Sequence, residues 1–421
     1  MSLRLSNDDQ AQLAGDCGPA ARMAMTIIVR MAEVCGVGSL MDITAAHIDS
    51  ALYQGDATLE FAERLAGLGA KVVVPTTLNV SGVDEHGWRD WAVPPEWAAK
   101  ARRQMIAYQG MGCQPTWTCA PYQTEWRPKF GQQVAWGESN AICFANSVIG
   151  ARTERYPDLM DICAAITGRI PAAGLHLTEN RAGQILMRLT DVPRRVQEDD
   201  EFYPVLGHLI GKVAQDRVPV VEGIVVEPAE DELKALCAAA ASSGAAALIH
   251  LAGVTPEAPT LEEAFHGKSP QQTIEVTMGS LRAARSELST ADGAKLEIVA
   301  LGSPHFSLAE FQKLAPMLEG KRCHRDVQFL VTSSRLMTEL ADRAGCLEPL
   351  RQFGGSVTVD TCILTTPMLH PEVKTLMTNS AKYAYYAPGL LGAQVVFGRL
   401  EDCVRSALEG RVVRDDSLWN E

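Results

Sequence analysis

Two cysteines and a serine occupy positions where proteins often present reactive side chains. Cys119 lies in "TWTCAPY", Cys362 in "VDTCILTTP" and Ser303 in "LGSPHFSL", each after apolar, β-prone residues. We expect both cysteines on solvent-facing loops at strand ends, because ligands of open α/β sheets bind at that edge. A thiolate is a soft metal ligand, whereas a hydroxyl is a harder one. A free cysteine is often a small buried side chain, so the site is predicted from the three groups together.

Polar residues around two further segments suggest an anion-binding function. "WGESNAICFANS" places Glu138, Ser139 and Asn140 at a predicted helix start, where backbone N–H groups favour a carboxylate or phosphate. A capped helix start explains the same residues equally simply. "TNSAKYAYYAPG" is predicted to be a loop bounded by glycine and proline, in which Ser380 and Lys382 could hold an anion. Surface lysines are the commoner alternative.

Several single residues are weaker candidates. Asn79 and Thr255 follow predicted strands, and Ser50 lies close to His47 in "TAAHIDSALYQGD". A lone histidine is usually a hydrogen-bonded structural residue, so a catalytic His47 is the less common interpretation. His305 could orient the Ser303 loop. A serine hydrolase and a nucleotide-binding loop are not indicated, because the chain has no G-x-S-x-G elbow and "CGVGSLMD" lacks a third glycine.

Composition narrows the classes of protein further. The net charge of −13 argues against a nucleic-acid-binding surface or a basic membrane-facing patch. No stretch approaches the roughly 20 apolar residues of a membrane span, and the first fifteen residues lack the pattern of a secretion signal. None of the 11 cysteines forms a C-x-x-C pair. Reduced thiols and a cytoplasmic location are therefore expected.

Short apolar runs alternate with helix-like stretches along most of the chain, which predicts an α/β fold with parallel-rich sheets covered on both faces. Two parts are expected, 1–190 with the Cys119 and substrate loops, and 191–421 with the Ser303 and Cys362 loops. The charged segment 189–204 is either a linker or an ordered loop. Strands are predicted at 71–75, 132–136, 218–226, 245–253, 295–302, 327–333 and 355–362. Helices are predicted at 8–15, 19–36, 58–70, 94–110, 139–151, 229–241, 308–320 and 334–345.

A set of motifs in order along the chain resembles one family. The motifs are "AHIDSALYQGDATLEFAERLAGLGAKVVVPTTLN", "TCAPY", "WGESNAICFANSVIGART", "HLAGVTPEAPT", "LGSPHFSLAEF", "VDTCILTTP" and "TNSAKYAYYAPGLLG". Together they resemble the catalytic, large part of aconitase X over essentially the whole chain. The resemblance implies an aconitase-like catalytic body and an iron–sulfur dehydratase.

The resemblance also implies a set of metal ligands. Carried over residue by residue, the cluster cysteines of the family fall on Cys119, Cys362 and the position of Ser303. Archaeal relatives that dehydrate mevalonate 5-phosphate carry cysteine at the third position, and serine there resembles the bacterial branch that dehydrates cis-3-hydroxy-L-proline. A hydroxyl is the poorer ligand, so a two-iron cluster is expected, with a larger cluster as the alternative.

The expected reaction converts cis-3-hydroxy-L-proline to 1-pyrroline-2-carboxylate. Family members need a small swivelling domain that carries the proton acceptor, so a separate small subunit or a fused domain is the expected partner. The alternatives are the large subunit of a mevalonate 5-phosphate dehydratase and a non-catalytic iron–sulfur sensor. Lys382, Ser303 and His47 are the catalytic candidates. The substrate-binding candidates are Ser50, Asn79, Glu138, Ser139, Asn140, Thr255, Ser380 and Lys382.

Overall fold

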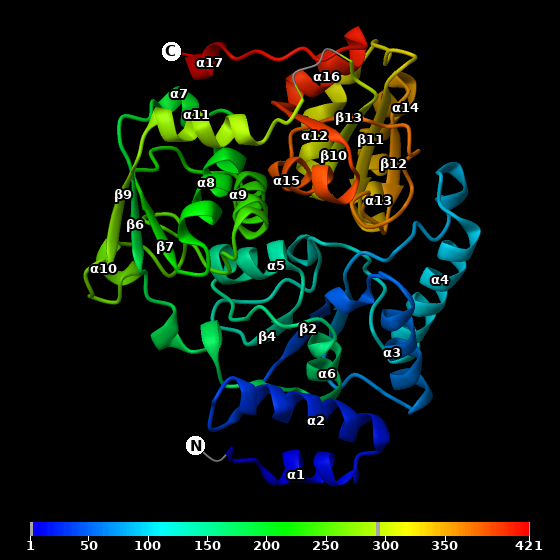
Figure 1. The fold of residues 1–421 in the computed structure, drawn as a ribbon, viewed down its shortest axis with the longest axis vertical. Helices are drawn as coiled ribbons and strands as arrows, with labels where there is room; N and C mark the ends of the chain where they lie inside the picture. The colour runs from blue at the N-terminus through cyan, green and yellow to red at the C-terminus, as the bar shows by residue number, and fades with distance from the viewer. Residues whose placement is uncertain (1–2, 292–294, 421) are drawn as a thin grey trace.

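Parallel strands form most of the sheet structure and helices cover them, which confirms the predicted α/β class (Figure 1). The structure is a computed structural model that describes residues 3–291 and 295–420. Within these ranges, the only antiparallel pairing between named strands joins β1 (Leu40–Asp42) to β5 (Arg169–Pro171). No helix in the described part of the chain is long and apolar enough to cross a membrane.

The N-terminal region holds a three-stranded parallel sheet in the order β3-β2-β4. Its strands are β2 (Ala45–Ile48), β3 (Thr76–Leu78) and β4 (Val134–Trp136). Local residues explain several of the helix starts around it, because proline lies in the first turn of α2 and α4 and Ser6 caps α1. These helices are α1 (Asn7–Ala14), α2 (Pro19–Val34), α3 (Asp56–Gly67), α4 (Pro95–Gly110), α5 (Ser139–Phe144) and α6 (Met160–Thr167).

The middle region holds a four-stranded parallel sheet in the order β8-β7-β6-β9. Its strands are β6 (Ile185–Leu189), β7 (Pro219–Glu222), β8 (His250–Leu251) and β9 (Gln272–Val276). The helices are α7 (Arg194–Gln197), α8 (Phe202–Ala214), α9 (Glu230–Ser243), α10 (Leu261–Ala264) and α11 (Met278–Glu287). The segment 189–204 is an ordered connection, because it contains α7 and the start of α8.

The C-terminal region holds a five-stranded parallel sheet in the order β12-β11-β10-β13-β14. Its strands are β10 (Ile298–Phe306), β11 (Gln328–Ser333), β12 (Ser356–Val359), β13 (Thr375–Thr378) and β14 (Gln394–Phe397). The helices are α12 (Leu308–Leu318), α13 (Arg335–Arg343), α14 (Leu347–Phe353), α15 (Ala381–Leu390), α16 (Leu400–Glu409) and α17 (Ser417–Asn420).

Three local predictions are wrong. The strand predicted to end at Pro75 instead begins after it, because proline has no N–H to donate to the pairing with β2. No strand precedes Cys119; only an isolated bridge between Thr77 and Gln114 is formed there. The predicted loop around Lys382 is helix α15, which is capped by the Ser380 side chain and runs through its internal proline.

The three regions meet near the centre of the molecule, where α5, α9 and α15 pack together (Figure 1). Helix α9 contacts α5 of the N-terminal region and α15 of the C-terminal region. One continuous buried cluster includes Phe144 of α5, Leu236 of α9 and Tyr383 of α15. The regions are therefore joined by a shared apolar core.

A close backbone approach bends β10 just before Ser303. The parallel pairing of β10 with β11 shifts register between Leu301 and Phe306. Gly302 has φ +93°, and a Cβ atom there would lie 2.1 Å from the carbonyl oxygen of Thr332. Glycine is therefore required at this position, and its conformation sets the direction in which the Ser303 segment leaves the sheet.

Gly302→Ala should lower the free energy of unfolding by about 3 kcal/mol or more, because a left-handed conformation and a backbone overlap both oppose the new methyl group. Gly320→Ala is the matched control: φ is +68° there and a Cβ would meet nothing within 4 Å. It should lose only about 1 kcal/mol. Urea unfolding measures both losses, and equal losses would contradict the steric argument.

Candidate functional site

A cavity of about 360 Å³ lies where loops of the N-terminal and C-terminal sheets meet. Asn79 follows β3, Glu138 follows β4, Ser303 lies in the last part of β10, and Cys362 follows β12. The cavity therefore occupies the ligand-binding edge of two parallel sheets at once. Its walls are formed by Leu52, Gln54, Asn79, Val80, Cys119, Glu138, Ser139, Gly302, Ser303, His305, Cys362, Leu364, Thr365, Lys382, Tyr386 and Leu390.

The two predicted thiol ligands share one wall of this cavity. Cys119 and Cys362 pack with Leu52 and Val80. Cys119 is only 7% exposed, so the expectation of a solvent-facing loop is wrong for this side chain. Burial raises the pKa of the Cys119 thiol to about 12, against the opposing effect of Lys382, and burial also raises the pKa of Cys362. Both groups are thus protonated at pH 7, and binding of a metal ion would reverse that preference.

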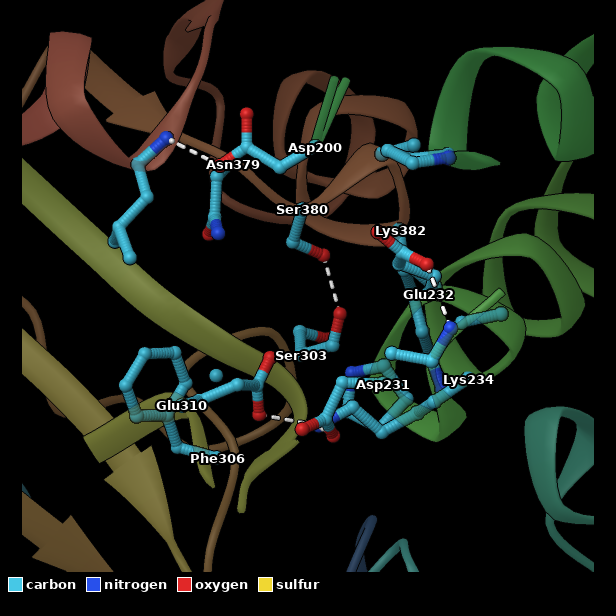
Figure 2. A pocket seen from close by; sticks show the side chains of 18 of the residues that line it. Asp200, Asp231, Glu232, Lys234, Ser303, Phe306, Glu310, Asn379, Ser380 and Lys382 are labelled. Carbon is cyan, nitrogen blue, oxygen red and sulfur yellow. Dashed lines mark hydrogen bonds and ion pairs between the residues drawn. The ribbon is translucent and has the colours of Figure 1, made fainter. Parts of the chain in front are cut away.

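Ser303 lies on the same wall and its backbone is held from α15. The Ser380 hydroxyl donates to the carbonyl oxygen of Ser303, and Figure 2 shows this contact from the start of α15. Ser380 therefore acts on the loop and also caps its own helix. His305, two residues after Ser303, is fully buried, and burial lowers the pKa of its ring to about 4, so the ring is neutral at pH 7.

A buried ion pair crosses the cavity. Nζ of Lys382 lies 2.6 Å from Oε1 of Glu138, and each side chain is 12% exposed. Burial alone would raise the pKa of Glu138, but the Lys382 charge and the Asn140 donors lower it to about 2. Burial alone would lower the pKa of Lys382, but the charge of Glu138, the hydrogen bond to it and the two nearby thiols together raise it. Lys382 is the one lysine among the described residues that lines this cavity.

Asn79 connects the ion pair to a carboxyl group that the sequence analysis missed. Its side-chain amide donates to Asp49 and, at 3.3 Å, to Oε2 of Glu138. Burial, and then the charges of Glu138 and Asp161, raise the pKa of Asp49 well above its usual range. The side-chain oxygen of Asn79 is buried and has no hydrogen-bond partner within the described ranges. The same side chain also acts on His47: burial lowers the pKa of that ring, and Asn79 opposes this larger effect.

Asn140 is a buried residue that holds two parts of the site together. Its side-chain amide donates to the Cys119 carbonyl oxygen at 3.1 Å and to Oε1 of Glu138 at 2.6 Å. The hydroxyl of Tyr122 donates to its side-chain oxygen at 3.0 Å. Asn140 itself is fully buried, so it holds the thiol segment and the carboxylate in place. Ser139 lines the cavity and donates to Glu138 at 3.3 Å.

Five predicted site residues do not line the cavity in the described structure. Asn140 and Ser380 support it through their hydrogen bonds, whereas the other three are bonded elsewhere. His47 is fully buried in β2, and its Nδ1 atom bonds the Thr77 hydroxyl at 2.8 Å. The Ser50 hydroxyl donates to Asp161 at 2.7 Å. Thr255 closes a turn after β8, where its hydroxyl accepts from the Leu251 backbone at 3.0 Å. Local sequence could not show that these side chains lie away from the cavity, because their hydrogen-bond partners depend on how the chain packs.

A second cavity, of about 240 Å³, also borders the Ser303 segment (Figure 2). Lys234 of α9 is nearly fully buried there, paired with Asp231 at 2.8 Å and with Glu310. Burial raises the pKa of Glu310 to about 7, against the opposing charge of Lys234. Sequence reasoning missed this cluster, because α9 reads as an ordinary amphipathic helix. Ser303 and Lys382 border both cavities.

No group of three or more His, Cys, Asp or Glu side chains in the described ranges is arranged to hold a metal ion. The thiol-lined cavity provides two cysteines and one serine instead. Fold and site together describe an α/β protein whose reactive groups meet at the carboxyl ends of parallel strands from separate sheets.

Comparison with known proteins gives the family. The aconitase X first-domain model matches residues 2–179, the second-domain model residues 183–286 and the third-domain model residues 296–409. The chain belongs to the aconitase X family. The crystal structure of Thermococcus kodakaraensis aconitase X (holo-form) superposes with a TM-score of 0.87 at 32% identity, covering 96% of this chain and all of that one. The two-part division at residue 190 stays a prediction.

Curated relatives are dehydratases. A cis-3-hydroxy-L-proline dehydratase of Pseudomonas aeruginosa is 47% identical over 99% of this chain and 72% of that protein. A protein of the same name from Hypocrea jecorina is 45% identical over 97% of this chain and 69% of its own length. A phosphomevalonate dehydratase large subunit from Methanosarcina mazei is 35% identical over 97% of this chain and 98% of its own length.

Lys382→Met leaves the Glu138 carboxylate without its cation, and we expect a loss of about 3 kcal/mol in the free energy of unfolding at pH 7. The pKa of Glu138 then rises above its unfolded value, so the deficit relative to the wild type should shrink as the pH falls from 7 to 5. Urea unfolding at both pH values measures this. Adding Glu138→Gln to Lys382→Met should recover most of the loss. Strictly additive losses would show that the two groups are not coupled.

Proposed function

We propose that this protein is a hydro-lyase that removes water from cis-3-hydroxy-L-proline and yields 1-pyrroline-2-carboxylate. The observation that carries the proposal is the convergence of two thiols and the Lys382–Glu138 pair on one cavity. Identities of 47% and 45% to two dehydratases named for this substrate support the choice of substrate.

An iron–sulfur cluster, the cofactor that the family resemblance implies, fits the donors at this wall. Cys119 and Cys362 pack together, and a backbone N–H points at the Cys119 sulfur as donors do around cluster ligands. We infer that these two cysteines are ligands and that Ser303 is a weaker oxygen ligand. Such a set suits a two-iron cluster better than a four-iron cluster. When bound, the cluster would supply a Lewis acid for the leaving hydroxyl or the carboxylate.

The chain's own polar groups provide the substrate contacts. Lys382 is placed to bind the substrate carboxylate, because it is the cavity's lysine in the described part of the chain. Glu138 favours the positive charge of the ring nitrogen, and Asn79, which donates to Glu138, lines the cavity beside it. Ser139 completes this polar wall, while Asn140 and Ser380 hold the segments that carry it.

The described residues of the cavity do not provide a suitable base for the reaction. His305 lines the cavity, but both of its ring nitrogens are already hydrogen-bonded. In the described ranges Glu138 is the carboxylate that lines the cavity, and a pKa of about 2 makes it a weak base. We therefore propose that a small swivelling domain, separate or fused, removes the α-proton and excludes water. Hydroxide then leaves C3 as water, and the resulting enamine becomes the cyclic imine when a proton moves from nitrogen to C3.

Mevalonate 5-phosphate is the less favoured substrate. Its phosphate would carry a charge near −2 and would be expected to bind several cationic donors. Lys382 is the one Lys or Arg side chain that the described structure places on the cavity wall. The protein therefore suits a substrate with a single carboxylate better.

Anaerobically reconstituted protein should dehydrate cis-3-hydroxy-L-proline only when a small domain is supplied, because the described cavity residues do not provide a suitable base. Proton NMR follows the loss of the C3 carbinol signal. The reaction is run with the chain alone, and with the segment of the Pseudomonas relative that this chain does not match. Mevalonate 5-phosphate serves as the control substrate.

Each contrary result of this assay identifies one error. Turnover by the chain alone would show that no external base is needed, and Glu138 would then be the candidate base. Turnover of mevalonate 5-phosphate in place of hydroxyproline would sink the choice of substrate. Iron binding without turnover of either compound in the presence of the small domain would favour the sensor alternative.

Cys119→Ala and Cys362→Ala should each lower iron per chain after reconstitution by at least about tenfold, since even outer-shell changes cost that much affinity. Iron analysis and visible absorption measure the loss, and far-ultraviolet circular dichroism checks the fold. Cys113→Ala is the matched control, because Cys113 is 4% exposed and does not line the cavity in the described structure. Retained iron in both cavity variants would refute the ligand assignment.

A further inference from the structure

His305 contacts all three segments that carry the proposed ligands. It follows Ser303 by two residues in β10 and is 1% exposed. Its backbone N–H donates to the Cys119 sulfur at 3.3 Å. Ring Nδ1 lies 3.2 Å from the hydroxyl of Thr118, and ring Nε2 lies 3.0 Å from the carbonyl oxygen of Thr361. Those two residues directly precede the two ligand cysteines.

The two ring contacts determine the tautomer. A carbonyl oxygen only accepts hydrogen bonds, so Nε2 carries the proton and donates to Thr361. Nδ1 of the neutral ring then accepts from the Thr118 hydroxyl. Both nitrogens are therefore used, each toward a different cysteine segment. An apolar side chain of similar size would leave both buried partners without this bond.

The backbone of His305 is held from the opposite side as well. Nζ of Lys234 donates to its carbonyl oxygen at 3.4 Å. Lys234 is in turn paired with Asp231 and Glu310, and Figure 2 shows these three side chains together beside the second cavity. The backbone N–H of His305 thus contacts the Cys119 thiol, and its backbone carbonyl oxygen contacts Lys234. The residue has little freedom to move.

We propose that His305 is a positioning residue that holds the Cys119, Ser303 and Cys362 segments in register for the cluster. The inference rests on the proposed function for the identity of the ligands. The Cys362 segment has a further contact, from the Thr361 hydroxyl to the Ser81 carbonyl oxygen at 3.2 Å. The ring of His305 bonds both cysteine segments, and its backbone N–H adds a second contact to Cys119.

The test compares three variants of the full chain. His305→Leu removes both ring contacts, whereas His305→Gln keeps a donor for the Thr361 carbonyl. His250→Leu is the matched control: His250 is also 1% exposed, its Nε2 bonds the Arg181 carbonyl at 2.8 Å, and it lies in β8. Two quantities are measured, namely the rate at which a chelator removes iron, and the rate at which iodoacetamide labels Cys119 and Cys362 in metal-free protein.

We expect iron loss to accelerate by at least about tenfold in His305→Leu, as for other outer-shell changes, and by less in His305→Gln. Labelling of both cysteines should also accelerate in metal-free His305→Leu, because the segments separate. His250→Leu should lose stability without changing either rate. Wild-type rates of iron loss and of labelling in His305→Leu would overturn the proposal.

Two further cases separate a failure of the proposed function from a failure of the positioning role. If the wild type binds no iron, the proposed function fails, and the labelling rates alone decide the positioning role. If His305→Leu does not fold, Thr118→Val replaces it and is compared with His305→Gln, because the Thr118 hydroxyl bonds Nδ1 and also accepts from the Ala120 N–H at 3.1 Å. Faster labelling of Cys119 in both Thr118→Val and His305→Gln supports the proposal, and an unchanged rate in either variant overturns it.

Discussion

The ion pair between Lys382 and Glu138 is the interaction on which the geometry of the site most depends. Lys382 lies in the first turn of α15 and Glu138 caps α5, so the pair joins the C-terminal region to the N-terminal region. Burial penalises each charge when it is alone. The two regions must therefore meet at the separation that brings Nζ and Oε1 to 2.6 Å. The cavity, and the thiols on its wall, follow from that separation.

Other polar groups along the same seam repeat this constraint. The Ser81 backbone N–H donates to the Asp360 carbonyl oxygen at 2.7 Å, which joins the loop after β3 to the end of β12. Arg335 of α13 binds both Asp360 and Glu85 at 2.6 Å. The Ser81–Asp360 and Arg335–Glu85 contacts cross the seam, whereas Arg335 and Asp360 both belong to the C-terminal region. The seam is thus specified by hydrogen bonding as well as by the shared apolar core.

Local sequence patterns were sufficient to predict the helices and strands whose formation depends mainly on neighbouring residues. Helices α9, α12 and α13 and strands β11 and β12 were predicted from amphipathic spacing and apolar runs, and each forms close to its predicted residues. The prediction failed at Pro75 and at α15, because proline was expected to end a strand at the first position and to bound a loop at the second. In α15 the Ser380 cap accepts from the Tyr383 N–H at 3.2 Å, and Pro388 lies near the helix end.

The sequence by itself determined the fold class, the family and the short segments that carry Cys119, Ser303 and Cys362, because motifs and periodicity are properties of neighbouring residues. Only the tertiary structure decided which side chains meet. It joined Lys382 to Glu138, added Asp49 to their network and left Thr255 and His47 away from the cavity wall. The reason is that a buried polar atom takes its partner from whatever the packing of distant sheets brings within about 3 Å, and local sequence contains no record of that distance.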